Sequence, residues 1–360
     1  METTRDSSLE HLVDRSGQSV RLGRRRFGLI LVAALLFVEG PTTVVAQRRA
    51  PAAVLRADSF IRIARDQSRS VVFLHTIERE SPRDETEGLG SGVVVGSGGL
   101  ILTNAHVVEN ASEVHVRLTD GTDVSTTLIG RDSASDLALL RAADATGLVP
   151  VTFGDSDLLD VGAHVVAIGN PLGLHHTVTA GIVSAKARGL DDSSLELIQT
   201  DAAINQGSSG GGLFDLRGRL VGITSNIVAP RGGGNIGLNF AIPVNVVKAL
   251  LPQLRTGSVR HGWLGVASRR VTSPVKNARG ESITALEVRQ TTPGSPAERA
   301  GLQRGDLLLH ARVPGAVIPA NTLHQAVWLA QPGTTIELSV WRDGRTRTVR
   351  ATLAYVPEKR

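Results

Sequence analysis

The alternation of apolar and polar residues between Val71 and Pro243 predicts a series of short β-strands. Segments such as VVFLHTI, SGVVVG and HVVAIGNP are rich in Val, Ile and Leu, and clusters of Gly, Asp, Asn and Pro separate them at hairpin-like intervals. About ten to a dozen strands of this kind in one region are typical of barrels or a sandwich. We therefore expect this region to be all-β.

Helical spacing of apolar residues appears on both sides of the strand region. Residues 50–70 predict one amphipathic helix, and residues 244–255 (VNVVKALLPQLR) predict a second. The polar stretch from Arg255 to Arg260 is the best candidate for a domain boundary.

The last hundred or so residues predict a separate, smaller domain. One helix is expected over Leu323–Ala330, ahead of a Pro332-Gly333 stop. Short strands are expected around Trp263–Val266, Leu286–Val288, Asp306–His310, Ile336–Trp341 and Val349–Leu353.

Composition supports a β-rich chain and excludes several functions. The 360 residues include 39 glycines and only 3% aromatic residues. The net charge of +5 comes mostly from arginine, without a dense basic run or interleaved aromatics, so no nucleic-acid partner is expected. The absence of cysteine excludes disulfides, thiolate metal sites and a cysteine nucleophile.

The N-terminus has the order of an export signal. A basic cluster precedes an apolar run from Phe27 to Val38, and small residues ending at Ala46 follow a Gly40-Pro41 break. The run is short of the ~20 residues that span a membrane, which favours cleavage after Ala46. An uncleaved anchor remains the alternative. Either outcome places the body of the protein outside the cytoplasm.

The stretch INQGSSGGGLF (Ile204–Phe214) is a candidate nucleophile loop. A glycine two positions before Ser209 lets the backbone turn so that the amides of Gly207 and Ser209 converge on one point, as an oxyanion hole requires. In this frame Ser209 is the nucleophile and Ser208 is a spacer. A simple Gly/Ser turn remains the alternative.

Two further residues complete the set that serine hydrolysis requires. His106 follows the apolar segment that ends near Thr103, and Asp136 precedes the apolar run LALL. Alone, each is more often a structural residue or a turn cap. Their joint occurrence with Ser209 in one β-rich region predicts a base, an acid and a nucleophile.

At these residues the chain resembles the HtrA (Deg) family of exported serine proteases. The resemblance runs from about residue 55 to 355, and it implies the base His106, the acid Asp136 and the nucleophile Ser209. It also implies a mainly β fold, in which a chymotrypsin-like double β-barrel precedes one PDZ domain. The segments that carry it are GSGVVVGSGGLILTNAHVV (90–108), SDLALL (135–140), AIGNPLGL (167–174), TVTAGIVSA (177–185), QTDAAINQGSSGGGLF (199–214), GRLVGI (218–223) and GLNFAIP (237–243).

Three departures from the family pattern surround the nucleophile. Gln206, Ser208 and Gly212 stand where the family usually has proline, asparagine and proline. None removes a catalytic atom, but each is expected to loosen or alter the loop that places the Gly207 amide. Since a missing oxyanion donor costs on the order of 3 kcal/mol, low basal activity is expected until something orders the loop.

The second domain resembles a PDZ domain. Residues 261–266 (HGWLGV) correspond to the family's carboxylate-binding loop, which assigns that role to Trp263, Leu264, Gly265 and Val266. Such a domain binds an extended C-terminus as an added strand. The segment HARVPGAVIPA (310–320) departs from the family's short turn. A PDZ fold that only spaces or assembles protomers is the alternative.

The residue patterns and the resemblance together predict four segments, and the resemblance implies a substrate preference. These are an export signal or anchor (1–46), a helical segment (47–70), a protease domain (71–255) and a PDZ domain (260–356). Residues before the nucleophile and after the glycine-rich loop would line an aliphatic specificity pocket that favours small or medium residues. The pocket residues are Ala203, Ile204, Leu238 and Phe240.

The family also implies a role in protein quality control. Unfolded or misfolded periplasmic proteins would be the substrates, trimers or larger homo-oligomers would form, and a membrane would be contacted only through an uncleaved leader. No metal or organic cofactor is required for the predicted chemistry. A weak or inactive chaperone scaffold is the main alternative, and a single-barrel esterase is a third.

Overall fold

The computed structural model describes residues 58–81, 84–118, 121–171, 176–189, 195–225, 237–276, 280–313 and 316–357. The predicted export signal and the first part of the predicted N-terminal helix lie outside these ranges. Within them, no helix is both long enough and apolar enough to cross a membrane.

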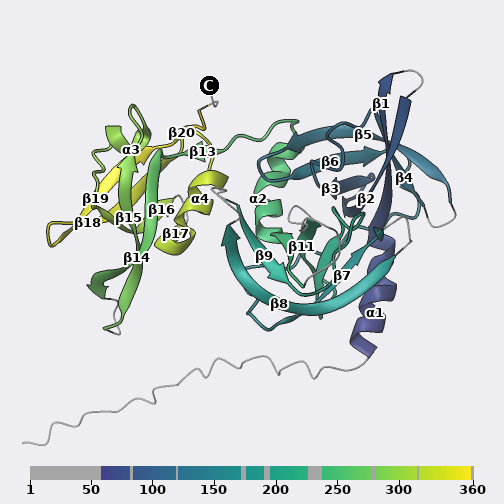
Figure 1. Cartoon of the computed structure of the whole chain (residues 1–360), viewed down its shortest axis with the longest axis horizontal. Helices are drawn as coiled ribbons and strands as arrows, with labels where there is room; N and C mark the ends of the chain where they lie inside the picture. The colour runs from purple at the N-terminus through teal and green to yellow at the C-terminus, as the bar shows by residue number, and fades with distance from the viewer. Residues whose placement is uncertain are drawn as a thin grey trace, which may run out of the picture. The chain divides into compact units, whose positions relative to one another are not determined.

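The first half of the strand region closes into a six-stranded antiparallel barrel (Figure 1). Its strand order is β1-β2-β3-β6-β5-β4, so the chain closes the barrel by pairing β1 with β4. The strands are β1 (Val71–Ser81), β2 (Asp84–Gly96), β3 (Leu100–Thr103), β4 (Glu113–Arg117), β5 (Asp123–Asp132) and β6 (Leu137–Ala142).

A second closed barrel follows with the order β10-β11-β12-β9-β8-β7. The two barrels confirm the predicted chymotrypsin-like double β-barrel, and their twelve strands agree with the number expected from the sequence. The strands are β7 (His164–Gly169), β8 (Thr177–Gly189), β9 (Glu196–Thr200), β10 (Gly212–Asp215), β11 (Leu220–Ser225) and β12 (Asn239–Pro243).

One apolar core joins the two barrels and the helices beside them. Leu102 and Leu139 of the first barrel belong to the same buried cluster as Phe214 of the second. Helix α1 (Asp58–Gln67) contributes Ile63, and helix α2 (Val244–Leu254) contributes Leu250. Both helices bury one apolar face, which explains their helical spacing in the sequence.

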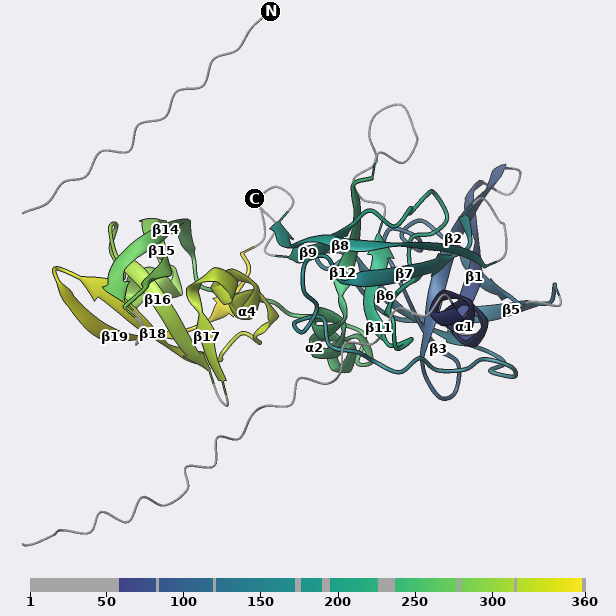
Figure 2. The ribbon, with the colours of Figure 1, turned by 90° about the horizontal axis from the view of Figure 1, so that it is seen from below.

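The C-terminal domain is a second β-structure (Figure 2). Most of its buried apolar side chains form a separate cluster. Its main sheet has the order β14-β15-β16-β18-β19, and β13 pairs separately with β20. The strands are β13 (Gly262–Trp263), β14 (Val266–Lys276), β15 (Ser282–Thr291), β16 (Leu307–Val313), β17 (Ala316–Pro319), β18 (Thr335–Arg342), β19 (Arg345–Thr352) and β20 (Ala354–Tyr355). The helices are α3 (Pro296–Arg299) and α4 (Leu323–Leu329).

Two details of this domain differ from the sequence-based expectation. The strand expected over Trp263–Val266 is interrupted, because Gly265 has a positive φ of 78° and separates β13 from β14. The segment 310–320 forms part of a hairpin, in which Arg312 of β16 pairs with Val317 of β17.

Gly212 is required by the packing of Phe214. Phe214 is fully buried, and a Cβ atom added at Gly212 would lie 2.5 Å from its Cε2 atom. That distance is a steric overlap in a close-packed interior. The glycine that departs from the family pattern therefore makes room for an aromatic ring.

We predict that Gly212→Ala lowers the free energy of unfolding by about 1–3 kcal/mol through overpacking. In a Phe214→Leu background the same substitution should cost less, because the overlapping ring atoms are gone. Urea denaturation of the four proteins in this double-mutant cycle measures the difference. An equal cost in both backgrounds would show that the ring is not the obstacle.

His261, where the C-terminal domain begins, makes a buried contact with the first barrel. Its Nε2–H donates to both carboxylate oxygens of Asp132 at 3.1 and 3.0 Å, and its ring stacks on Trp328 with centroids 3.9 Å apart. Burial alone would raise the pKa of Asp132. Hydrogen bonds from His261 and Ser135 outweigh that effect and hold the pKa below its usual value.

The lowered pKa predicts how the Asp132 contribution to stability depends on pH. The contribution is present above the ordinary carboxyl pKa of ~4 and disappears as the pH falls through the lower, folded-state pKa. Asp132→Asn should cost about 1–3 kcal/mol at pH 7 and less at pH 3. Urea denaturation at both pH values tests this, with the exposed Asp160→Asn as control. A cost that does not shrink in acid would contradict the assignment.

Candidate active site

Asp136 lies in the turn that leads into β6, with its backbone in the left-handed region at φ 55°. Aspartate tolerates this region better than most residues. The side-chain amide of Asn104 donates to the Asp136 carbonyl at 3.0 Å and fixes the turn from the segment that follows β3. The backbone therefore turns the carboxylate away from the strand and toward His106.

Asp136 holds His106 by its ring and by its backbone. His106 Nδ1 lies 2.9 and 3.0 Å from the two carboxylate oxygens, and the His106 amide donates to Oδ1 at 3.0 Å. Ser225, from the second barrel, donates its hydroxyl to Oδ2 at 3.1 Å. A carboxylate at Nδ1 places the proton there and leaves Nε2 as the acceptor that a general base needs.

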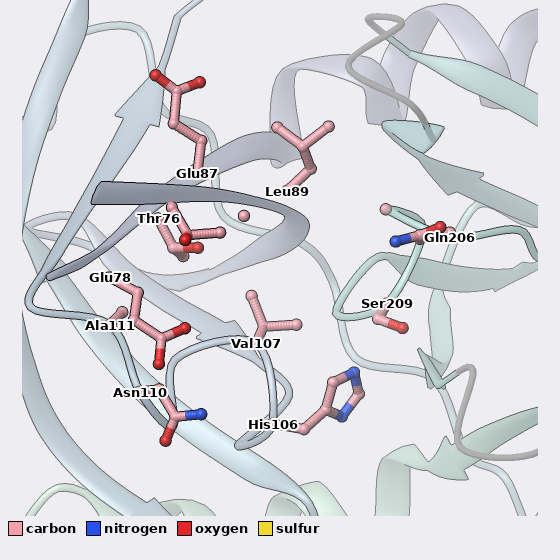
Figure 3. A pocket seen from close by; sticks show the side chains of 13 residues that line it. Thr76, Glu78, Glu87, Leu89, His106, Val107, Asn110, Ala111, Gln206 and Ser209 are labelled. Carbon is pink, nitrogen blue, oxygen red and sulfur yellow. The ribbon is translucent and has the colours of Figure 1, made fainter. Parts of the chain in front are cut away.

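Ser209 and His106 line the same open cleft, which has a volume of ≈ 380 Å³ (Figure 3). Their polar ends lie on the same side of the cleft, with the imidazole beside the serine hydroxyl in the view of Figure 3. The His106 side chain is 42% exposed, whereas that of Asp136 is 10% exposed. The structure thus brings His106, Asp136 and Ser209 together. The candidate base, His106, is partly exposed, and the candidate acid, Asp136, is shielded from solvent.

The loop that carries Ser209 is tied to the first barrel through Ser91 of β2. The Ser91 amide donates to the Ser209 carbonyl at 2.8 Å, and its hydroxyl donates to the Gly207 carbonyl at 2.7 Å. Within the second barrel, Thr224 donates its hydroxyl to the Ser208 carbonyl at 2.6 Å. These bonds fix three consecutive carbonyls of the loop.

Glycine allows both the turn and the close approach of the two barrels. Gly207 has a φ of 91°, which orients its carbonyl toward Ser91. Gly210 also has a positive φ, and a Cβ atom there would collide with the Ser91 carbonyl oxygen. Within the described residues, no acceptor takes a hydrogen bond from the Gly207 amide. This amide is therefore available to a ligand.

The four residues expected to form a specificity pocket are not equally placed. Ile204 and Phe240 are 3% and 8% exposed and belong to core clusters. Ala203 lines a small pocket behind the nucleophile loop, and Leu238 is 48% exposed. The structure therefore leaves Ala203 and Leu238 as candidates for substrate contact and assigns the other two side chains to packing.

The three departures around the nucleophile occur in an ordered loop. Gln206 lines the cleft, the Ser208 amide donates to the Asn205 carbonyl at 2.9 Å, and Gly212 begins β10. The loop is thus held by hydrogen bonds that do not require the family's usual residues at these positions.

The sequence reasoning missed Ser91 and Ser225. Each touches the site through a hydroxyl that bonds to a residue far away in the chain. Ser91 lies in the quoted segment 90–108, and Ser225 ends β11. No local signal distinguishes them, because β2 also contains Glu85, Thr86 and Glu87, and Ser225 directly follows Thr224 in β11.

The family model described as a trypsin-like peptidase domain matches residues 90–223. The chain is 44% identical over 278 residues to a probable periplasmic serine endoprotease DegP-like of Ectopseudomonas mendocina (strain ymp), covering 76% of this chain and 58% of that protein. It is 39% identical over 282 residues to the periplasmic pH-dependent serine endoprotease DegQ of Escherichia coli (strain K12), covering 76% and 61%.

The chain spans a little over half the length of these curated relatives, but nearly all of several solved structures. The HtrA-type protease AlgW with tripeptide is similar with a TM-score of 0.68 and 32% identity, over 83% of this chain and 98% of that one. A serine endoprotease from Yersinia pestis is similar with a TM-score of 0.58 and 31% identity, over 84% and 100%. Sequence and fold together show that this chain belongs to the HtrA (Deg) family of serine proteases.

Proposed function

We propose that this chain is a serine endopeptidase that acts outside the cytoplasm. The observation that carries the proposal is the imidazole of His106, held at Nδ1 by both oxygens of Asp136 and lining one cleft with Ser209. The peptidase family model covers all three residues.

In the proposed reaction, Ser209 attacks the scissile carbonyl while His106 Nε2 takes its proton. His106 then gives that proton to the leaving amine, and the acyl-enzyme forms. Water activated by the same histidine hydrolyses the acyl-enzyme and regenerates Ser209. Asp136 remains ionised throughout, because its task is to orient the ring and stabilise the imidazolium.

The amides of Gly207 and Ser209 would bind the oxyanion of the tetrahedral intermediate. Support comes from the hydrogen bonds that Ser91 and Thr224 make to the loop. Donors that are fixed before the substrate arrives do not have to be reorganised during the reaction. We therefore propose that this loop is set without an activating ligand, in spite of Gln206 and the other departures.

On the acyl side of the scissile bond, we propose a preference for small or medium aliphatic residues. Ala203 adds only a methyl group to the wall behind the nucleophile loop, and Leu238 supplies an exposed apolar side chain. Apolar walls of this kind discriminate mainly by size.

The biological setting is proposed from the relatives. The names of the two curated relatives describe periplasmic serine endoproteases, so we propose a periplasmic location reached through the export signal or anchor at 1–46. Unfolded or misfolded periplasmic proteins would be the substrates. Homo-oligomers, as trimers or multiples of them, would form around the protease domain 71–255.

The C-terminal domain, 260–356, is proposed to be a PDZ domain that binds the free C-termini of peptides. Its support is the turn at Gly265 between β13 and β14, next to a core that α4 shares with the sheet. The proposed carboxylate site consists of Trp263, Leu264, Gly265 and Val266. A peptide would add to the sheet as a strand beside β14.

Loss of any member of the triad should abolish proteolysis. Ser209→Ala and His106→Ala should each lower kcat/KM for an unfolded protein substrate at least about 10³-fold, and Asp136→Asn by about 10⁴-fold. The rate at which each full-length variant degrades a fluorescently labelled, unfolded protein measures these changes.

The double variant Ser209→Ala with His106→Ala adds a control for this test. Since the two residues act as a unit, it should be about as inactive as either single variant. Degradation at the wild-type rate by all of these variants would end the triad proposal. Absence of degradation by the wild type itself would leave a chaperone scaffold as the alternative.

Peptide binding by the C-terminal domain should depend on a free carboxylate. An apolar decapeptide should bind to full-length Ser209→Ala chain, and the same peptide with an amidated C-terminus should bind at least about tenfold more weakly. Fluorescence anisotropy measures both affinities with the protein intact. Equal affinity for the two peptides would refute a carboxylate-binding role.

A further inference from the structure

The cleft beside Ser209 and His106 is acidic on the side of the first barrel. The described residues that line it include two carboxylates, Glu78 and Glu87, and neither a lysine nor an arginine. Both glutamates come from the β1–β2 hairpin, whereas His106 and Asn110 come from the segment between β3 and β4 (Figure 3). Nothing in the proposed chemistry uses these carboxylates.

Strand pairing explains why Glu78 faces the cleft. Thr76 pairs with Gly88 and Glu78 pairs with Thr86, so these four residues share one face of the hairpin. All four line the cleft. Arg79, on the opposite face, bonds to Glu85 at 2.7 Å and does not neutralise Glu78.

The polar groups on this face are available to a ligand. Within the described part of the chain, Glu78 has no hydrogen-bond or ion-pair partner, in contrast to Glu87, which lies 3.2 Å from His75 Nε2. Thr76 is only 7% exposed, lines the cleft and has no protein partner for its hydroxyl. Gly88 leaves the space for that hydroxyl, since a Cβ atom there would collide with it. The Thr76 hydroxyl opens onto the cleft and is not one of the buried polar atoms without a partner, so a ligand or water in the cleft can hydrogen-bond to it.

The position of the cleft relative to Ser209 identifies the part of the substrate it receives. The candidate acyl-side residue Ala203 lies in a different pocket, built from the second barrel. The acidic cleft is bounded by His106, which protonates the departing amine, and by Gly207. A substrate segment after the scissile bond would therefore run along Glu78 and Thr76.

We propose that Glu78, assisted by the Thr76 hydroxyl, makes this enzyme prefer lysine or arginine at one of the first three positions after the cleaved bond. The ammonium or guanidinium group would pair with the Glu78 carboxylate and donate to the Thr76 hydroxyl oxygen. The inference rests on the proposed endopeptidase function, because it concerns the substrate segment that leaves first.

The test uses peptides that share one acyl-side sequence with valine before the cleaved bond. Lysine, glutamine or glutamate is placed singly at the first, second or third position after that bond, and products are mapped by mass spectrometry. At one of these positions lysine should raise kcat/KM about fivefold over glutamine, the size expected of a partly exposed ion pair. Glutamate at the same position should lower it.

Two variants of the β1–β2 hairpin distinguish a specific effect of the Glu78 carboxylate from a general effect of negative charge on the hairpin. Glu78→Gln should bring the lysine peptide to the rate of the glutamine peptide. Glu85→Gln, on the opposite face of the same hairpin, should keep the lysine preference. Raising NaCl from 50 to 500 mM should reduce the preference in the wild type, because an open cleft is screened by salt.

A binding measurement makes the test independent of turnover. Full-length Ser209→Ala should bind the lysine peptide about fivefold more tightly than the glutamine peptide, and adding Glu78→Gln should remove the difference. Equal cleavage and binding of the lysine, glutamine and glutamate peptides, or a lysine preference that survives Glu78→Gln, would overturn the inference alone. Absence of Ser209-dependent cleavage would overturn the proposed function as well.

Discussion

The candidate active site depends on hydrogen bonds that cross from one β-barrel to the other. His106 and Asp136 belong to the first barrel and Ser209 to the second, so chemistry requires the two halves to be held in register. Ser91 reaches from the first barrel to the nucleophile loop, and Ser225 reaches from the second barrel to Asp136. Both contacts are buried, where a missing partner would leave an unsatisfied polar group. The hydrogen bonds that stabilise the interface between the two barrels (the seam) therefore also position the reacting groups.

Close approach of the barrels at this seam limits which residues can occupy it. Gly210 lies against the Ser91 carbonyl, where a side chain would collide. Gly212 makes room for Phe214, whose ring fills the core shared by both barrels. The loop thus combines a rigid backbone with an exposed cleft. The carboxylate of Glu78 lines the main cleft, and Ala203 lines a second, smaller pocket with Thr179 and Asn205.

Local patterns predicted barrels or a sandwich over 71–243 and helices over 244–255 and 323–330, whereas the double barrel was predicted from the family resemblance. The candidate triad was predicted from the joint occurrence of its three residues together with that resemblance. Local patterns were insufficient where the role of a residue depends on partners that are distant in the sequence. Ser91 contacts a carbonyl 116 positions away, and no periodicity reports such a pair. Ile204 was expected to line a pocket because it precedes the nucleophile, and Phe240 because it follows the glycine-rich loop. Both side chains are buried and pack in the core instead. Glu78 was not predicted as a site residue, because only the register of β1 against β2 shows that its side chain shares a face with Thr76.

Labelling with a fluorophosphonate tests the central claim most directly, because the reagent reacts with a serine only when a base and an oxyanion hole are aligned on it. Intact wild-type chain should carry one adduct, mapped by mass spectrometry to Ser209, and His106→Ala should carry none. An adduct at Ser208 or Ser91, or equal labelling of wild type and His106→Ala, would contradict a triad assembled across the two barrels.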